Sequence, residues 1–206
     1  MRVLVIGATG RTGKQLVTKL LARGDTVTAF ARRPADITET HERLRVVQGD
    51  VRDAASLERA VKAQDAVVSA FGPRSLGRDD IQELLMRHLI AAMKAEDVRR
   101  VVSLSAWGAG TTKGSGGLVF GIARVLFLRH VFADKERGEA LLVGSDLDWV
   151  SVHPGRLLDA PARGGVRSSA DGRGLARSMT REDLAAFMID QLQSDAWLRK
   201  SVIVGY

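Results

Sequence analysis

The stretch VLVIGATGRTGKQLV, residues 3–17, joins an apolar run to a glycine loop and a helical pattern. The run has the length of a buried strand, and Gly7, Gly10 and Gly13 follow it at three-residue spacing. Glycines at this spacing between a strand and a helix permit a tight turn, close approach to a pyrophosphate and close helix packing. The stretch therefore predicts a phosphate-binding loop, with a plain strand-to-helix turn as the alternative.

The other residues of this loop belong to the same predicted site. The amino terminus of the following helix offers free N–H groups and a partial positive charge, which suit a phosphate. We assign Thr9, Arg11 and Thr12 to cofactor binding together with the three glycines.

Beyond the loop, strand-length apolar runs alternate with helical periodicity along most of the chain, as in a parallel sheet covered by helices. The expected strands are Arg2–Ile6, Thr26–Phe30, Leu44–Gln48, Ala66–Ala70, Arg100–Leu104, Trp149–His153 and Ser201–Val204. The expected helices are Arg11–Ala22, Ser56–Val61, Asp79–Glu96, Leu118–Val143 and Arg181–Leu192. The fold class is α/β: a Rossmann-type doubly wound parallel sheet with helices on both faces. We expect a single domain over residues 1–206 with a small C-terminal substrate-side segment.

Composition narrows the class of protein. At 206 residues without cysteine, the chain can build a core without disulfides and fits a cytoplasmic protein. The apolar run near the start is too short for a signal peptide. The longest apolar stretch, Leu118–Phe132, contains charged residues and is shorter than the roughly 20 residues a bilayer requires, so no membrane span is expected.

The net charge of +7 and the pI near 10.3 raise the question of nucleic acid. The arginines are scattered among acids, and aromatic residues make up only 5% of the chain, so stacking platforms are scarce. Nucleic acid is therefore an unlikely partner. The histidines lack partners at metal-ligand spacing, and we expect no metal site.

The end of the second strand, TAFARRP, indicates which dinucleotide binds. An acid there normally takes the ribose 2′-hydroxyl of NAD, whereas arginine suits a 2′-phosphate. Arg32 and Arg33 occupy this end, and the nearest acid, Asp36, lies past Pro34. The sequence therefore favours NADPH, with solvated surface arginines as the alternative. After the third strand, Asp50 and Val51 could hold the adenine, although Asp50 is equally well explained as a turn residue.

Five motifs, in order, resemble the atypical short-chain dehydrogenases: GATGRTG, GDVRD, DAVVSAFG, VRRVVSLSAWG and DLDWVSVHPGRLLD. More narrowly, AAMKAEDVRRVVSLSA and DGRGLARSMTREDLAAFM are similar to the NAD(P)H-binding group that includes biliverdin IXβ reductase/flavin reductase and the NmrA-like regulators. The resemblance covers nearly the whole chain. It implies the fold more directly than the activity.

The resemblance also implies site residues. Asp50 and Val51 would take the adenine, and Ser105 would lie next to the nicotinamide. The residues expected to line the ribose and pyrophosphate of the cofactor are Ala70, Phe71 and Gly72. The segment expected to run past the carboxamide of the nicotinamide consists of His153, Pro154, Gly155, Arg156 and Leu157.

Departures from the family pattern concern the proton donor. The tyrosine of the usual Tyr-x-x-x-Lys pair is absent, since the only tyrosine is Tyr206. Lys135 stands where many relatives have a lysine, and Glu139 follows four residues later on the same helix face. Where the biliverdin/flavin reductase branch has histidines, this chain has Glu139 and Arg156.

The candidate catalytic residues are Ser105, Lys135 and His153. Each also has a purely structural explanation: Ser105 as a strand-end cap, Lys135 as a solvated helix charge and His153 as a buried histidine. Trp107 and Phe120 could stack on a planar acceptor or belong to the core. FMN or FAD would then be a substrate rather than a bound cofactor.

Two functions remain open at this point. The first is an NADPH-dependent reductase that transfers hydride to a flavin-like, quinone-like or tetrapyrrole acceptor, for which solvent can supply the proton. The second is a non-catalytic NADP(H) sensor of the NmrA-like kind, which the missing tyrosine favours. Either protein could be a monomer or a homodimer.

Overall fold

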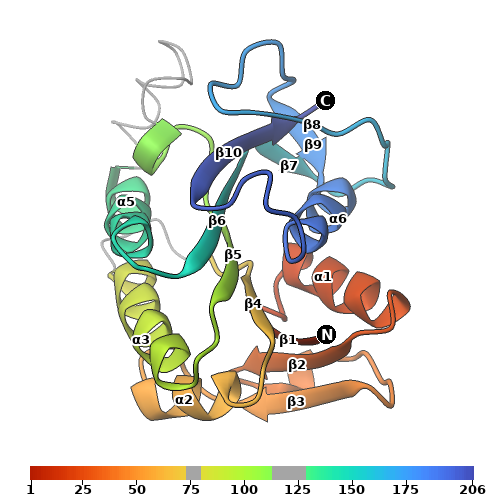
Figure 1. The fold of residues 1–206 in the computed structure, drawn as a ribbon. Coiled ribbons are helices and arrows are strands. Elements are labelled where there is room, and N and C mark those ends of the chain that lie inside the picture. Colours follow the sequence, from red (N-terminus) through yellow and green to blue (C-terminus); the bar gives the residue numbers. More distant parts are fainter. Residues whose placement is uncertain (73–79, 113–128) are drawn as a thin grey trace.

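A parallel sheet forms the centre of the structure, a computed structural model that describes residues 1–72, 80–112 and 129–206. In this part of the chain the sheet runs in the order β3-β2-β1-β4-β5-β6-β10-β8, and only β8 is antiparallel to its neighbour (Figure 1). The strands are β1 (Arg2–Ile6), β2 (Thr26–Ala31), β3 (Leu44–Gln48), β4 (Ala66–Ser69), β5 (Arg100–Leu104), β6 (Asp148–Pro154), β8 (Arg167–Ser169) and β10 (Lys200–Gly205). This arrangement confirms the predicted α/β class, because the chain turns in opposite directions from the adjacent strands β1 and β4.

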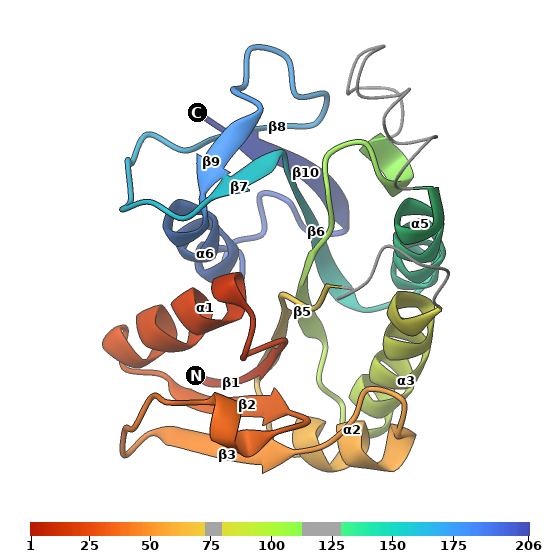
Figure 2. The same ribbon diagram turned by 180° about the vertical axis from the view of Figure 1, so that it is seen from behind.

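Helices cover both faces of the sheet (Figures 1 and 2). They are α1 (Arg11–Ala22), α2 (Ala54–Val61), α3 (Ile81–Ala95), α5 (Arg129–Val143) and α6 (Arg181–Asp190), with 3-10 turns η1 (Pro34–Asp36) and η2 (Gly110–Thr112). α1 and α6 pack on one face with Val3 and Val5, whereas α2 and α3 pack on the other with Leu4 and Ile6. Successive residues of β1 are thus buried on opposite faces, which explains why the strand is apolar throughout.

The C-terminal third differs most from expectation. A second sheet pairs β7 (Arg156–Leu158) with β9 (Ser178–Thr180), and neither strand is predicted from periodicity. The segment 163–174, which contains none of the expected strands, supplies β8 to the edge of the main sheet. The first part of the helix expected over Leu118–Val143 lies outside the described residues, and α5 accounts for the rest.

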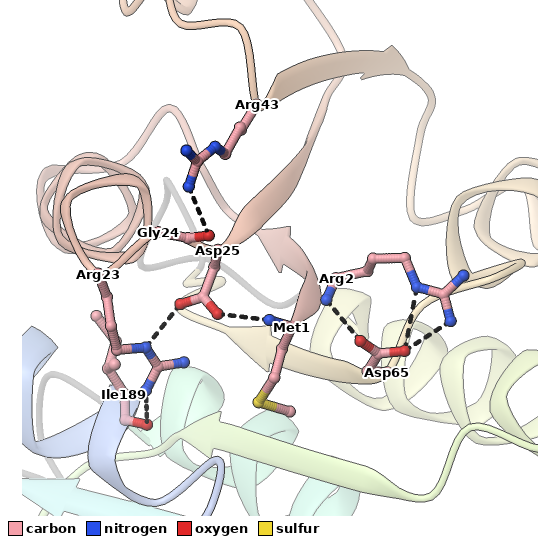
Figure 3. A network of polar contacts seen from close by, with 8 residues as sticks. All are labelled: Met1, Arg2, Arg23, Gly24, Asp25, Arg43, Asp65 and Ile189. Carbon is pink, nitrogen blue, oxygen red and sulfur yellow. Dashed lines mark hydrogen bonds and ion pairs between the residues drawn. The ribbon is translucent and has the colours of Figure 1, made fainter.

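The amino ends of three neighbouring strands are tied together by charge (Figure 3). Asp25, just before β2, accepts from the Met1 ammonium at 2.9 Å and from Arg23 Nε at 2.6 Å. Asp65, just before β4, accepts from the Arg2 backbone at 2.7 Å and from its guanidinium at 2.6 Å. The charged contacts therefore occupy the edge of the sheet opposite the carboxyl ends.

Helix α3 receives its N-terminal cap from another helix. Asp134 of α5 is 2% exposed and accepts the backbone N–H groups of Gln82 and Glu83 at 3.0 and 3.1 Å. The helices lie so close at Gly138 that a Cβ there would be 2.9 Å from the Gln82 carbonyl oxygen. The carboxylate thus satisfies two N–H groups that have no partner inside their own helix.

We expect Asp134→Ala to lower the free energy of unfolding by about 2 kcal/mol, because two buried N–H groups lose a charged acceptor. Urea denaturation followed by circular dichroism measures the change. Asp134→Asn keeps one acceptor oxygen and is expected to lose less free energy of unfolding than Asp134→Ala. An Asp134→Ala midpoint equal to that of the unsubstituted protein would show that the cap does not stabilise the fold.

Candidate functional site

A cavity of about 540 Å³ opens at the carboxyl ends of β1, β2, β3 and β4. Its wall includes many residues expected to bind the cofactor: Gly7, Thr9, Gly10, Arg32, Arg33, Val51, Ala70, Phe71 and Gly72. It also includes residues to which the sequence assigned no part in cofactor binding: Ile6, Phe30, Ala31, Asp36, Gly49, Arg52 and Ile81. The cavity extends outward from the junction of β1 and β4, where ligands bind in doubly wound sheets.

The glycine loop closes tightly at the inner wall of this cavity. Gly7 has a φ of +81°, and a Cβ on it would lie 2.8 Å from the carbonyl of Ala70. The Gly7 carbonyl accepts the Gly10 N–H at 2.9 Å, and a Cβ on Gly13 would overlap the same carbonyl oxygen. The first turn of α1 thereby lies directly against the end of β1.

The amino terminus of α1 is suited to an anion. Its N-cap, Gly10, makes no side-chain cap hydrogen bond, and the first turn carries no acid. Thr12 and Gly13 are buried in that turn. Because the first N–H groups of a helix have no partner inside the helix, a phosphate at this end of the cavity would satisfy them.

The arginines that follow β2 lie in the outer wall. Arg33 donates from Nε and Nη2 to Asp36 Oδ2 at 3.0 and 2.8 Å, while Arg32 has no ion-pair partner in the described part of the chain. Although Asp36 lies past Pro34 in the sequence, η1 folds it back into the cavity wall. Its negative charge is matched there by Arg33.

Two other predicted cofactor residues are engaged elsewhere. Arg11 is outside the cavity wall and donates from Nη1 to Asp159 Oδ2 at 2.6 Å. Asp159 also accepts from Arg181 at 2.7 Å. Asp50 accepts the backbone N–H of Arg52 at 2.9 Å, as a turn residue does, whereas Val51 is 4% exposed and lines the cavity.

A second polar group, centred on Glu139, lies at the carboxyl end of β5. Ser105 Oγ donates to Glu139 Oε2 at 2.9 Å. Glu139 Oε1 accepts from Ser201 Oγ at 3.1 Å and from Thr111 Oγ1 at 3.3 Å, and it lies 3.1 Å from His153 Nε2. The Glu139 side chain is 5% exposed. This buried carboxylate therefore accepts hydrogen bonds from hydroxyls of β10 and of the segment that follows β5.

The His153 ring is fully buried among polar partners. Nδ1 lies 3.0 Å from the Ala106 carbonyl oxygen, and Nε2 faces the Glu139 carboxylate. Ser151 Oγ also lies 2.9 Å from Nε2 and Thr112 Oγ1 3.1 Å from Nδ1, so each ring nitrogen has two polar neighbours. The ring has no exposed surface for a substrate, so His153 can act only through its buried polar neighbours, Glu139 among them.

The charge of Glu139 follows from its partners. Burial raises the pKa of Glu139, but the hydrogen bond and positive charge of His153, with the hydroxyls of Ser105 and Ser201, outweigh burial. The pKa therefore lies below its ordinary value of 4.5. At neutral pH the carboxylate is ionised and keeps the Ser105 hydroxyl donating toward it.

Lys135 lies one helical turn before Glu139 and is half-buried. Burial lowers the pKa of Lys135 to about 8, although the negative charges of Glu139 and Asp134 oppose the shift. A small cavity of about 20 Å³ separates Lys135 from Ser103, Ser105 and Glu139. A space of this size can hold one water molecule among these polar groups.

The predicted acceptor-binding aromatics have different outcomes. Trp107 is buried, its backbone N–H donates to the Pro154 carbonyl at 2.8 Å, and the Arg177 guanidinium lies 5.3 Å from the ring centroid. A Cβ on Gly172 would lie 2.5 Å from the same ring. The indole is thus packed on two sides. Phe120 lies outside the described residues.

The segment after β6 stays close to this group. Pro154 is buried, and Gly155 has no room for a Cβ, which would overlap the Arg177 carbonyl oxygen. Arg156 is exposed. The carboxyl end of β6 thus brings Pro154, Gly155 and Arg156 beside Trp107 rather than into the large cavity.

Sequence reasoning assigned no role to the residue on which the second polar group depends. Glu139 was noted for its spacing from Lys135 and as a departure from a family histidine; the spacing is a usable signal, because residues four apart share a helix face. Its contacts with His153 and Ser201 join positions far apart in the sequence. No local pattern indicates them.

The described residues contain no group of three or more histidine, cysteine or acidic side chains able to hold a metal ion. Among the helices of these residues, none has the length and apolar character needed to cross a bilayer.

Comparisons with known proteins agree on the family. A family model described as NAD(P)H-binding matches residues 7–195. Over 117 residues the chain is 38% identical to sterol demethylase protein B of Methylococcus capsulatus and 38% identical to cinnamoyl-CoA reductase 1 of rice, Oryza sativa. These matches cover 53% and 52% of this chain but only 35% of each relative.

Among solved structures, ChuY, an anaerobilin reductase of Escherichia coli O157:H7, has a TM-score of 0.81 and 23% identity. The similarity covers 100% of this chain and 97% of ChuY. At this identity the likeness concerns the fold.

We expect the contribution of Glu139 to stability to depend on pH. A carboxyl whose pKa is lowered in the folded state stabilises the fold above its unfolded value and loses this effect as pH falls through the folded pKa. The difference in free energy of unfolding between the unsubstituted protein and Glu139→Gln should therefore be large at pH 7 and shrink below pH 4.5. Urea denaturation across this range measures it.

A double-mutant cycle with His153→Gln tests the pair directly. Removing one partner of a buried ion pair leaves the other charge without compensation. The double variant should therefore lose less free energy of unfolding than the sum of the losses in the two single variants. Simple additivity would contradict a direct ion pair.

Proposed function

Because the chain belongs to the NAD(P)H-binding family, whose model matches residues 7–195, we propose that it is an NADPH-dependent reductase. It transfers hydride to a small planar acceptor such as a flavin, a quinone or a tetrapyrrole. The observation that carries this proposal is the position of two polar sites on one edge of the sheet. The large cavity lies at the ends of β1–β4, and the Ser105–Glu139 group follows the next strand, β5.

The residues of the cavity fit a dinucleotide. The glycine loop and the uncapped first turn of α1 suit the pyrophosphate, while Val51 provides an apolar surface for the adenine. Arg32 suits a 2′-phosphate, and Arg33 joins it while neutralising Asp36. The bound nicotinamide supplies the hydride.

At the acceptor end, the side chains hold and move protons. Ser105 donates to Glu139, which leaves the lone pairs of its oxygen available to accept from the carboxamide or the acceptor. Lys135 carries a proton at neutral pH and can release it readily, because its pKa is lowered to about 8. His153 is a positioning residue that keeps Glu139 ionised.

One observation favours a second candidate, the non-catalytic NADP(H) sensor. Tyr206, the only tyrosine of the chain, donates to Asp183 Oδ2 at 2.6 Å and accepts the Thr180 N–H at 3.1 Å. It is therefore used at the start of α6 and cannot replace the missing acid. A sensor would bind NADPH without consuming it.

We expect the purified protein to oxidise NADPH when FMN, a quinone or biliverdin is added, and Ser105→Ala to lower kcat/KM by about tenfold to hundredfold through loss of a positioned hydroxyl. Absorbance at the NADPH band follows turnover, and fluorescence titration gives the dissociation constant of NADPH.

Ser145→Ala is the matched control, because the Ser145 hydroxyl donates to the Leu142 carbonyl at 2.6 Å and Ser145 is not among the residues lining either cavity. Tight NADPH binding without turnover on any acceptor would favour the sensor. Failure to bind either nucleotide would contradict both candidates.

We expect Arg32→Gln to raise the dissociation constant of NADPH by about tenfold and to leave that of NADH nearly unchanged, because a charge-assisted contact to the 2′-phosphate is lost. Arg33→Gln should weaken NADPH binding more than Arg32→Gln does, since it also leaves the Asp36 carboxylate unpaired in the cavity wall.

Fluorescence titration with both nucleotides measures the ratio. Arg45→Gln on β3 is the control, because Arg45 is exposed and outside the cavity wall. Equal losses for NADPH and NADH in Arg32→Gln would contradict 2′-phosphate binding at this position.

A further inference from the structure

Residues 156–181 hold an excess of positive charge beside the proposed acceptor site. They contain six arginines and two aspartates. β7 and β9 hold the ends of this segment together, with the Arg156 N–H donating to the Arg177 carbonyl at 2.7 Å. This charge lies past the carboxyl end of β6 rather than in the dinucleotide cavity.

Several of these arginines have a structural role. Arg181 and Arg173 pair with Asp159 and Asp171 at 2.7 and 3.2 Å. Arg167 donates to the Gly174 carbonyl. Both acids of the segment are therefore already engaged by arginine.

The remaining arginines make other contacts. Arg163 lies over the Tyr206 ring, with its guanidinium carbon 4.7 Å from the ring centroid. Arg177 lies over the Trp107 ring. Arg156 is exposed and differs from the other five in that its guanidinium makes no hydrogen bond, ion pair or ring contact in the described residues.

Arg156 is also the arginine that follows β6 directly. It comes immediately after Gly155, whose neighbour Pro154 accepts the Trp107 N–H at 2.8 Å. Trp107 itself lies two residues after Ser105. Backbone contacts therefore hold the Arg156 main chain beside that of Arg177, whose guanidinium covers Trp107, two residues from Ser105.

We propose that the acceptor reduced by this protein is an anion, and that Arg156 binds its phosphate or carboxylate group. This inference rests on the proposed reductase function and adds a substrate class to it. An unpaired guanidinium on a fixed strand presents a planar pair of donors that suits both oxyanions. The nearby Arg177 adds positive charge, which favours an anion further.

FMN and riboflavin provide the first test, because they share the isoalloxazine ring and differ by one phosphate. Steady-state turnover with saturating NADPH gives KM for each flavin. We expect the ratio of the riboflavin KM to the FMN KM to exceed one, and Arg156→Gln to reduce it about tenfold. A ratio cancels any effect of the substitution on the bound dinucleotide.

Arg173→Gln is the matched control, because it removes the same charge from the same segment while Arg173 is paired with Asp171. Its ratio should remain that of the unsubstituted protein. An equal fall in both variants would indicate a general effect of net charge and overturn the assignment to Arg156.

A second pair distinguishes the two oxyanions. Biliverdin carries carboxylates that its dimethyl ester lacks. A charge preference for FMN alone would identify a phosphate, and a preference for biliverdin over its ester would identify a carboxylate. Equal KM values within both pairs would overturn the anion site while leaving the reductase intact.

Binding measurements test the anion site separately from the reductase activity. Flavin fluorescence and biliverdin absorbance, measured on the NADP⁺-saturated protein, report acceptor binding without turnover. Arg156-dependent binding of the anionic member of a pair, without turnover, would support the anion site and contradict the reductase. No binding of any of the four compounds would overturn the anion site.

Discussion

The close approach of α1 to the end of β1 is the constraint on which the rest of the site depends. Gly7 turns the chain with a positive φ, and Gly13 leaves no space for a Cβ beside the Gly7 carbonyl. Because the helix begins so close to the strand, its free N–H groups lie at the rim of the cavity between β1 and β4. The buried apolar residues of β1 fix both elements against the two core layers.

The second site depends on a different interaction, the buried contact between His153 and Glu139. A carboxylate in the interior is costly unless it is paired and hydrogen-bonded, and Glu139 has the His153 ring and three hydroxyls around it. The contact connects β6 to α5 and fixes the direction of the Ser105 hydroxyl. Lys135, on the same helix, is held near this negative charge, yet burial still lowers its pKa to about 8. Fold stability and the proposed proton handling thus depend on the same side chains.

Positive charge is divided between structure and recognition. Arg23 and Arg2 tie strand ends together, and Arg181 holds the loop after β7 through Asp159. Arg32 and Arg156 differ because the described residues offer them no ion pair, and they belong to the two ends of the proposed site. The high net charge therefore does not require a nucleic-acid partner. Much of it is already neutralised locally, and the remainder suits small anions.

The sequence alone determined the order of the helices and of the parallel strands β1–β6 and β10, and the glycine loop, because each depends on local periodicity or on backbone freedom at one residue. It also placed Arg32, Arg33 and Val51 at the cavity, since the carboxyl ends of parallel strands meet at one edge. Only the tertiary structure decided that Asp36 returns to Arg33, that Arg11 pairs with Asp159, and that His153 is enclosed behind Glu139. The last two contacts join residues far apart in the chain, and the first depends on a turn that folds back. Long-range contacts and loop paths leave no period in the sequence, so packing decided them.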